Sequence, residues 1–149
     1  MKIEPADSKL WYQMNGDNTY RINYNLNPNS IVVDIGARHG NWSDLIKQRY
    51  GCNVYCFEAV KEFCEQLKLK NYIVFNYAVV DDFGTIDLGI FEGEASILYD
   101  NNDTNNIINV ESIPAFKMFE LIDKDYIDLM KINVEGAENN IMVLFFFGL

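Results

Sequence analysis

The sequence is poor in basic residues, and this shortage excludes one large class of function. Lys and Arg total 12 against 22 Asp and Glu, so the formal net charge is −10. Proteins that follow a phosphate backbone need clustered lysines and arginines. Here Lys61, Lys68 and Lys70 are interleaved with Glu62 and Glu65, so they do not make a basic stripe. We therefore expect no nucleic-acid partner.

Histidine and cysteine are also scarce, which argues against a metal centre. The chain has one histidine, His39, and three cysteines, Cys52, Cys56 and Cys64, with no C-x-x-C pair among them. This set does not match the ligand spacing of a zinc site, so we expect no metal. Cys56 falls in a predicted strand, where a cysteine usually acts as a small buried hydrophobe.

Long apolar segments are missing as well. Residues 1–10 lack the apolar core of a secretory signal, and no apolar run approaches the ~18–20 residues of a membrane span. We expect a cytoplasmic protein with reduced thiols and no membrane span. What the chain does have is 49% hydrophobic residues over 149 positions, enough for one domain with a substantial core.

The most informative segment is residues 31–43, where a predicted buried strand leads through a glycine loop into a helix. The strand, IVVDI over residues 31–35, is typical of a parallel sheet buried on both faces. Gly36 and Gly40 allow a sharp turn and a close approach of ligand to backbone. Asn41 or Ser43 can cap a helix over residues 42–49. Such an arrangement points backbone N–H groups at a nucleotide.

The spacing of the loop favours one kind of nucleotide. A dinucleotide fingerprint, G-x-G-x-x-G, has glycines where this chain has Arg38 and Asn41, so pyrophosphate binding is disfavoured. The pattern D-x-G-A-x-x-G at residues 34–40 suits a ligand without phosphates, whose ammonium and carboxylate need separate partners. S-Adenosylmethionine has that chemistry. A nicotinamide-dinucleotide domain remains the less favoured alternative.

Glu58 is the second element of the predicted cofactor site. It ends a predicted strand over residues 53–57 and lies 24 positions after Asp34 (58 minus 34). At about this separation, nucleotide-binding α/β folds place the acid that accepts both ribose hydroxyls. A carboxylate suits that task because it offers two acceptor oxygens and no donor.

Strand and helix patterns alternate along the rest of the chain and predict an α/β fold. Residues 1–30 form a polar extension, with a hairpin expected around the turn at residues 15–17. From residue 31 to 149 we expect the cofactor-binding domain. Its predicted elements are strands at 31–35, 53–57, 72–77, 85–90 (or a hairpin edge) and 127–133, helices at 42–49, 60–68 and 115–122, and a polar loop at 99–106. The β-α-β-α-β order implies a parallel, right-handed sheet covered on both faces.

Three segments resemble the FkbM-type methyltransferases. They are residues 33–40 (VDIGARHG), 57–59 (FEA) and, most specifically, 131–138 (KINVEGAE). Weaker similarity extends the match to about residues 29–142. The resemblance implies a Rossmann-like methyltransferase fold, with three α/β/α layers and strand order 3-2-1-4. It also implies an S-adenosylmethionine-dependent enzyme, and many such enzymes methylate oxygen on small molecules or sugars.

The resemblance also implies roles for individual residues. Cofactor binding is assigned to a set near the first two strands and the end of the third: Asp34, Gly36, Ala37, Gly40, Asn41, Glu58, Asn76 and Ala78. Amides of residues 37–41 would meet the methionyl end, and Asp34 would act near its ammonium. Phe57 or Tyr77 flanks the adenine or is simply a core aromatic. Candidates for handling the acceptor hydroxyl are His39, Asn133, Glu135 and Glu138.

Two departures from the family leave a second hypothesis open. The family usually has Asp where this chain has Asn133, and an amide cannot act as a base. The family's three further strands are expected to be missing from the C-terminal end. The alternative is therefore a catalytically degenerate cofactor-binding fragment or interaction module of the same fold. We expect a small-molecule or carbohydrate acceptor, and a homodimer through the edge of the fourth strand or the apolar tail at 141–149.

Overall fold

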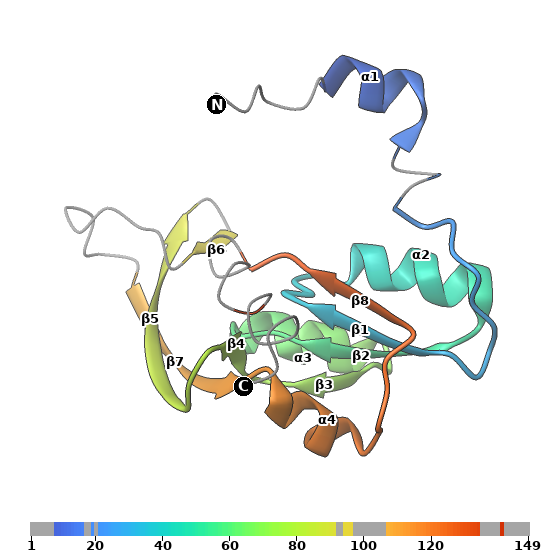
Figure 1. Ribbon diagram of the computed structural model, residues 1–149. Helices are drawn as coiled ribbons and strands as arrows, with labels where there is room; N and C mark the ends of the chain where they lie inside the picture. The colour runs from blue at the N-terminus through green and yellow to red at the C-terminus, as the bar shows by residue number, and fades with distance from the viewer. Residues whose placement is uncertain are drawn as a thin grey trace, which may run out of the picture.

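The computed structural model describes residues 8–16, 19, 21–91, 94–96, 107–134 and 141 (Figure 1). In order, the helices and strands of this part of the chain are α1 (Ser8–Gln13), β1 (Ile31–Ile35), α2 (Asn41–Tyr50), β2 (Asn53–Phe57), α3 (Lys61–Leu69), β3 (Ile73–Phe75), β4 (Ala78–Val80), β5 (Gly84–Phe91), β6 (Glu94–Ser96), β7 (Ile107–Pro114), α4 (Phe116–Ile122) and β8 (Leu129–Ile132). Helices and strands alternate up to β3, and the five strands from β3 to β7 follow one another before α4. The chain thus has the α/β class that its sequence predicts.

The centre of the fold is a parallel sheet of four strands in the order β3-β2-β1-β8. Counted along the chain within this sheet, that is the order 3-2-1-4. All five residues of β1 are buried, as their apolar run predicts for a strand covered on both faces. Asp128 anchors the start of β8, because its carboxylate accepts from the Ile31 amide at 2.7 Å and its own amide donates to the Ile31 carbonyl at 2.9 Å.

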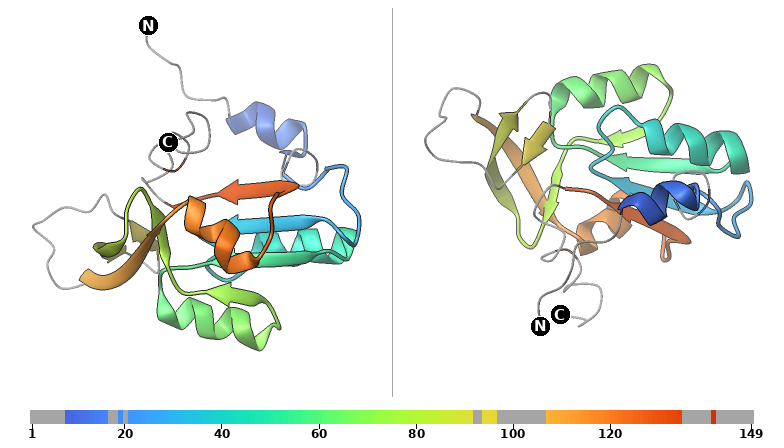
Figure 2. Two further views of the ribbon diagram at one scale, coloured as in Figure 1. Left: turned by 60° about the horizontal axis from the view of Figure 1, so that its bottom comes forward. Right: turned by 90° about the horizontal axis from the view of Figure 1, so that it is seen from above.

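Helices cover both faces of this sheet. Trp42 and Ile46 of α2 and Leu67 of α3 pack on the face that carries Val32 and Val54. On the other face, α4 packs on the alternate residues of β1 and β2, and the members of this cluster from outside the sheet include Met118, Ile122, Val79, Ile113 and Ile141. Figure 2 shows α2 and α3 on one side of the strands and α4 on the opposite side.

A second sheet, β4-β7-β5-β6, is the largest feature that the sequence did not predict. β7 pairs parallel with β4 and antiparallel with β5, and β5 pairs antiparallel with β6. The expected edge strand at 85–90 is part of β5, but β7 was not anticipated. Its apolar and polar residues do not alternate cleanly, because the strand contacts different layers along its length.

Two local expectations are corrected. The first arm expected for an N-terminal hairpin is instead helix α1, and Asn15 after it has a left-handed φ of 52°. The expected third strand at 72–77 is shorter, since β3 ends at Phe75 and the chain then enters β4 of the other sheet. In the part of the chain that the structure describes, no helix combines the length and apolar character required to span a membrane.

Candidate functional site

The candidate site lies at the carboxyl edge of the parallel sheet. In open α/β sheets ligands bind there, because the loops that leave neighbouring strands meet at one edge. β1 and β2 pair so that Ile35 lies opposite Phe57, and β1 and β8 so that Ile35 lies opposite Ile132. This register brings together the loop at residues 36–40, Glu58 and Asn133, as the sequence predicts for parallel neighbours.

Contacts with the end of β2 hold the β1–α2 loop in place. The Gly36 and Ala37 amides both donate to the carbonyl of Phe57, at 2.9 and 3.3 Å. Arg38 takes a left-handed φ of 50°, and its amide donates to a Glu58 carboxylate oxygen at 2.7 Å. The three amides that follow β1 therefore bind the protein itself, whereas the sequence suggested that amides from residue 37 onward would meet a ligand.

The two glycines of the loop are needed for close contacts within the fold. A Cβ on Gly36 would lie 1.9 Å from the Asn133 carbonyl oxygen, and one on Gly40 would lie 2.7 Å from the Leu67 side chain in α3. Both residues have positive φ, 73° and 75°, which side chains rarely adopt. Gly40 is also the residue that precedes α2, with no side-chain cap, so neither Asn41 nor Ser43 caps that helix.

Glu58 lies directly after β2, at the edge that carries the candidate site. Its carboxylate lies at the end of β2, and its two oxygens accept from the Arg38 and Val60 amides at 2.7 and 2.9 Å. The residue is only 6% exposed. Burial raises the pKa of this carboxyl above its usual value, against the opposing effect of hydrogen bonds from the Val60, Arg38 and Ala59 amides. Glu58 thus ties the second strand to the loop after the first.

Asp34 does not face the edge. It is fully buried, and its two carboxylate oxygens accept from the Ser43 hydroxyl at 2.6 Å and from the Lys131 ammonium at 2.8 Å. Lys131 stands directly opposite Asp34 in the β1–β8 register. The cation that Asp34 contacts in the structure is therefore the Lys131 ammonium of the protein itself, and its expected role near the ammonium of a bound cofactor stays a prediction.

Asn76 and Ala78 lie where the chain leaves the parallel sheet. The Asn76 side-chain amide donates to the carbonyls of Glu58 and Ala59 at 2.9 and 2.8 Å, so it fixes the backbone that carries Glu58. Ala78 begins β4 and is buried in a small cluster with Leu88. Phe57 stacks on Phe75 within the core, with ring centroids 4.8 Å apart.

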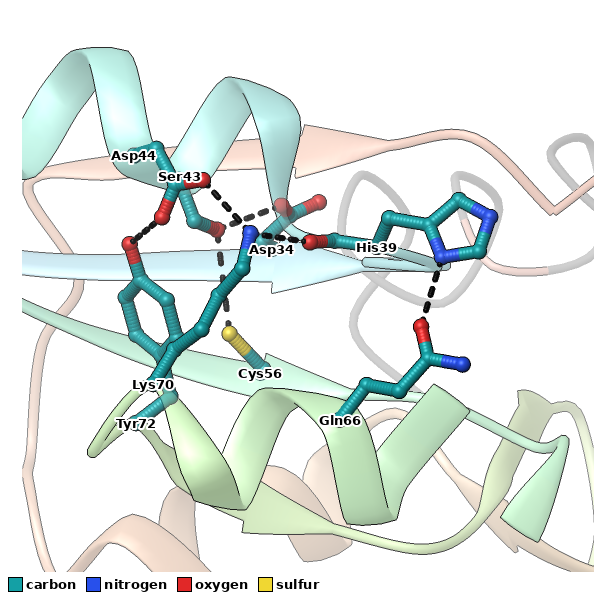
Figure 3. A network of polar contacts seen from close by, with 8 residues as sticks. All are labelled: Asp34, His39, Ser43, Asp44, Cys56, Gln66, Lys70 and Tyr72. Carbon is teal, nitrogen blue, oxygen red and sulfur yellow. Dashed lines mark hydrogen bonds and ion pairs between the residues drawn. The ribbon is translucent and has the colours of Figure 1, made fainter. Parts of the chain in front are cut away.

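His39 points toward α3, as Figure 3 shows. Its Nδ1 lies 2.8 Å from the Gln66 side-chain oxygen, and its ring meets Phe63 edge-on at 4.7 Å. The Lys70 ammonium donates to the His39 carbonyl at 2.7 Å and to the Asp44 carboxylate at 2.6 Å. These contacts fasten the loop to the helix after β2.

Four predicted site residues remain, two of them among the described residues. Asn133 is exposed, and its backbone amide donates to the Ile35 carbonyl at 3.0 Å. Asn41, in the first turn of α2, is exposed too. Glu135 and Glu138 lie outside the described residues. Within the described ranges no group of three metal-binding side chains occurs.

A cavity of about 490 Å³ lies elsewhere, on the second sheet beside α4. It is lined by residues of β5, β7, α4 and the turns next to them: Tyr77, Phe83, Gly84, Thr85, Glu111, Ser112, Ile113, Lys117 and Leu121. Of the predicted site residues, Tyr77, one of the two aromatics predicted to flank the adenine, lines it, whereas none of the eight residues assigned to cofactor binding does.

Comparison with known proteins identifies a family for this chain. The family model of the methyltransferase FkbM domain matches residues 34–144, well over half of the chain. The chain belongs to the FkbM methyltransferase family. No curated protein and no solved structure matched it. The match covers the glycine loop, Glu58 and Asn133, and membership indicates a methyltransferase.

Two polar residues of this FkbM domain were missed by the sequence analysis as parts of the site. Lys131 and Ser43 complete the buried group around Asp34. A signal for Lys131 was present, because a lysine within the apolar run of strand 127–133 needs a buried partner. The sequence alone does not identify Asp34 as that partner, because the two residues are 97 positions apart and meet only through the register of their strands.

Proposed function

We propose that this chain binds S-adenosylmethionine at the carboxyl edge of its parallel sheet and transfers the methyl group to a hydroxyl oxygen of a small molecule or sugar. The observation that carries the proposal is the position of Glu58 against the β1–α2 loop. Family membership supports methyl transfer, and Glu58 supports a nucleoside-type ligand.

The chemistry of Glu58 fits a ribose. A carboxylate has about four acceptor sites, and the Arg38 and Val60 amides use one on each oxygen. The Ala59 amide makes a further hydrogen bond to this carboxylate, and the acceptor capacity that remains suits the donors of a ribose diol. Burial strengthens such hydrogen bonds because the local dielectric constant is low.

Positioning would supply much of the rate. When bound, S-adenosylmethionine would supply a sulfonium methyl group; the acceptor oxygen would bond to that methyl carbon in line as the C–S bond breaks and S-adenosylhomocysteine leaves. Glu58 would hold the ribose, and the loop would fix the nucleoside relative to the end of β8. Asn133, at that end, can orient an acceptor hydroxyl by accepting or donating a hydrogen bond, but it cannot take up its proton.

The proton of the acceptor hydroxyl must pass to a base. If His39 Nδ1 donates to the Gln66 oxygen, Nε2 carries the lone pair that a general base needs. Glu135, two residues after Asn133 in the chain, is the other proposed base. Replacing each one singly with Gln, and comparing how the methyl-transfer rate depends on pH, separates the two.

Calorimetry tests the cofactor assignment. We expect S-adenosylmethionine or S-adenosylhomocysteine to bind in the micromolar range and NAD at least ten times more weakly. Glu58→Ala should cost about 1–3 kcal/mol of binding free energy, because the ribose loses a charged acceptor. The exposed Glu62→Ala on α3 serves as the control. Unchanged affinity in Glu58→Ala would remove this residue from the site.

Asn133 favours a second candidate function, a degenerate domain that binds the cofactor but transfers nothing. The two candidates differ in turnover and not in binding. A labelled methyl group offered with a panel of sugar and small-molecule hydroxyls distinguishes them. If Asn133→Asp transfers methyl groups and the natural chain does not, the natural chain is a degenerate cofactor-binding domain.

A further inference from the structure

The ion pair of Asp34 and Lys131 is the most buried ion pair among the described residues. Asp34 has no exposed surface, and the Lys131 side chain is 18% exposed. Both carboxylate oxygens of Asp34 are hydrogen-bonded, one to Lys131 and one to Ser43. Removing one member of such a pair leaves an uncompensated charge inside the fold, so the pair should persist whether or not a ligand is bound.

Lys131 also reaches the loop. Its ammonium lies 3.3 Å from the carbonyl oxygen of Gly36 and 5.9 Å from the centre of the Trp42 ring. One side chain from β8 thereby contacts the end of β1, the first residue of the loop and the first turn of α2. The contact of Lys131 with the Gly36 carbonyl restricts the conformation of the peptide units that follow. These units position the Arg38 amide to donate to the Glu58 carboxylate.

We propose that Lys131 is a positioning residue for cofactor binding. It is the resident cationic partner of Asp34, and the pair holds the Gly36 carbonyl and so the loop that supports Glu58. Asp34 then affects the cofactor through this loop and does not bind the methionyl ammonium directly. This inference rests on the proposed function, because it assigns roles within the same site.

Two ligands separate the direct and the indirect role of Asp34. S-Adenosylhomocysteine carries the ammonium and carboxylate, whereas 5′-methylthioadenosine has the same nucleoside and a thioether but lacks both groups. If Asp34 acts through the loop, Asp34→Asn and Lys131→Met should each lower the affinity for both ligands by the same factor, at least fivefold. A loss confined to S-adenosylhomocysteine in Asp34→Asn would overturn the proposal, because it would show direct contact with the ammonium.

Matched variants control for charge and folding. Lys124→Met removes an exposed lysine and should leave both affinities unchanged. Lys131→Arg keeps the charge and should recover most of the affinity lost in Lys131→Met. The double variant Asp34→Asn, Lys131→Met leaves no unpaired buried charge, so the comparison of the two ligands remains possible if a single variant does not fold.

Hydrogen exchange tests the loop without any ligand. The Gly36, Ala37 and Arg38 amides are all hydrogen-bonded to the end of β2, so their exchange should be slow in the natural chain. We expect exchange at these three amides to accelerate at least tenfold in Lys131→Met and to stay the same in Lys124→Met. Unchanged exchange would overturn the positioning role. Failure of the natural chain to bind either ligand would instead reject the proposed function and leave this measurement valid.

Discussion

Gly36 and Asn133 meet backbone to backbone where β1 and β8 end, so closely that a Cβ on Gly36 would lie 1.9 Å from the Asn133 carbonyl oxygen. The Asn133 amide in turn donates to the Ile35 carbonyl at 3.0 Å. The backbone of Asn133 is therefore fixed in place at this edge of the sheet.

This contact predicts a graded effect of alanine at three glycines with similar positive φ. Gly36→Ala should lower the free energy of unfolding by about 3 kcal/mol or more, since the clash is with backbone that cannot rotate away. Gly51→Ala, where a Cβ would meet only Pro28 at 3.8 Å, should cost about 1 kcal/mol for the left-handed conformation alone.

Gly40→Ala should fall between them, because the Leu67 side chain in its way can shift. Urea unfolding of the three variants measures the order. A Gly36→Ala protein as stable as Gly51→Ala would show that β8 does not approach the loop as closely as described.

The Asp44 carboxylate should contribute a pH-dependent part of the stability. Desolvation alone would raise its pKa, but hydrogen bonds from Lys70 and Tyr72 outweigh this and hold the pKa below the ordinary value of 3.8. A depressed carboxyl pKa stabilises the fold above the unfolded value, and this contribution is lost as the pH falls through the folded value. Lys70→Met should therefore move the pKa of Asp44 upward in a carboxyl NMR titration.

Lys68→Met is the matched control for that titration, because among the described residues the ion-pair partner of Lys68 is Glu65, at 4.0 Å, and not Asp44. It should leave the pKa of Asp44 unchanged. An equal shift in both variants would mean that general surface charge, and not the Lys70 contact, sets the pKa.

The cysteines should be inert while the chain is folded. Cys52 and Cys56 have no exposed surface and Cys64 is 1% exposed. Burial raises the pKa of Cys56 and of Cys64 to about 12, so almost no thiolate forms near neutral pH. A thiol reagent at pH 8 should modify three groups in denaturant and none rapidly in the native protein. Fast native labelling would contradict the burial.

We also expect self-association through the edge of β8. Among the residues that the structure describes, β8 pairs only with β1, which leaves its outer backbone groups as a template for another strand. Of the apolar tail, Ile141 is buried in the core and the remainder lies outside the described residues. The net charge of −10 acts only over about 8 Å at physiological salt, too short to prevent pairing. Light scattering should show a homodimer, and a monodisperse monomer at high concentration would contradict this prediction.

The sequence by itself determined the parallel core and the edge where the site lies. The apolar run of β1 and the glycines after it are local signals, and a strand buried on both faces must be central. Glu58 was located for the same reason, because its distance in sequence from the loop follows from one β-α-β unit.

Only the tertiary structure decided what the polar residues touch. The partner of Asp34 depends on the register between β1 and β8. The hydrogen-bond partners of the loop amides depend on where Phe57 and Glu58 lie at the end of β2. The strand β7 likewise gains its hydrogen bonds from β4 and β5, with which it shares no local pattern. Hydrophobic periodicity in the sequence indicates which face of a helix or strand is buried. A hydrogen bond between residues distant in sequence forms only when the two elements that carry them pack in a particular register.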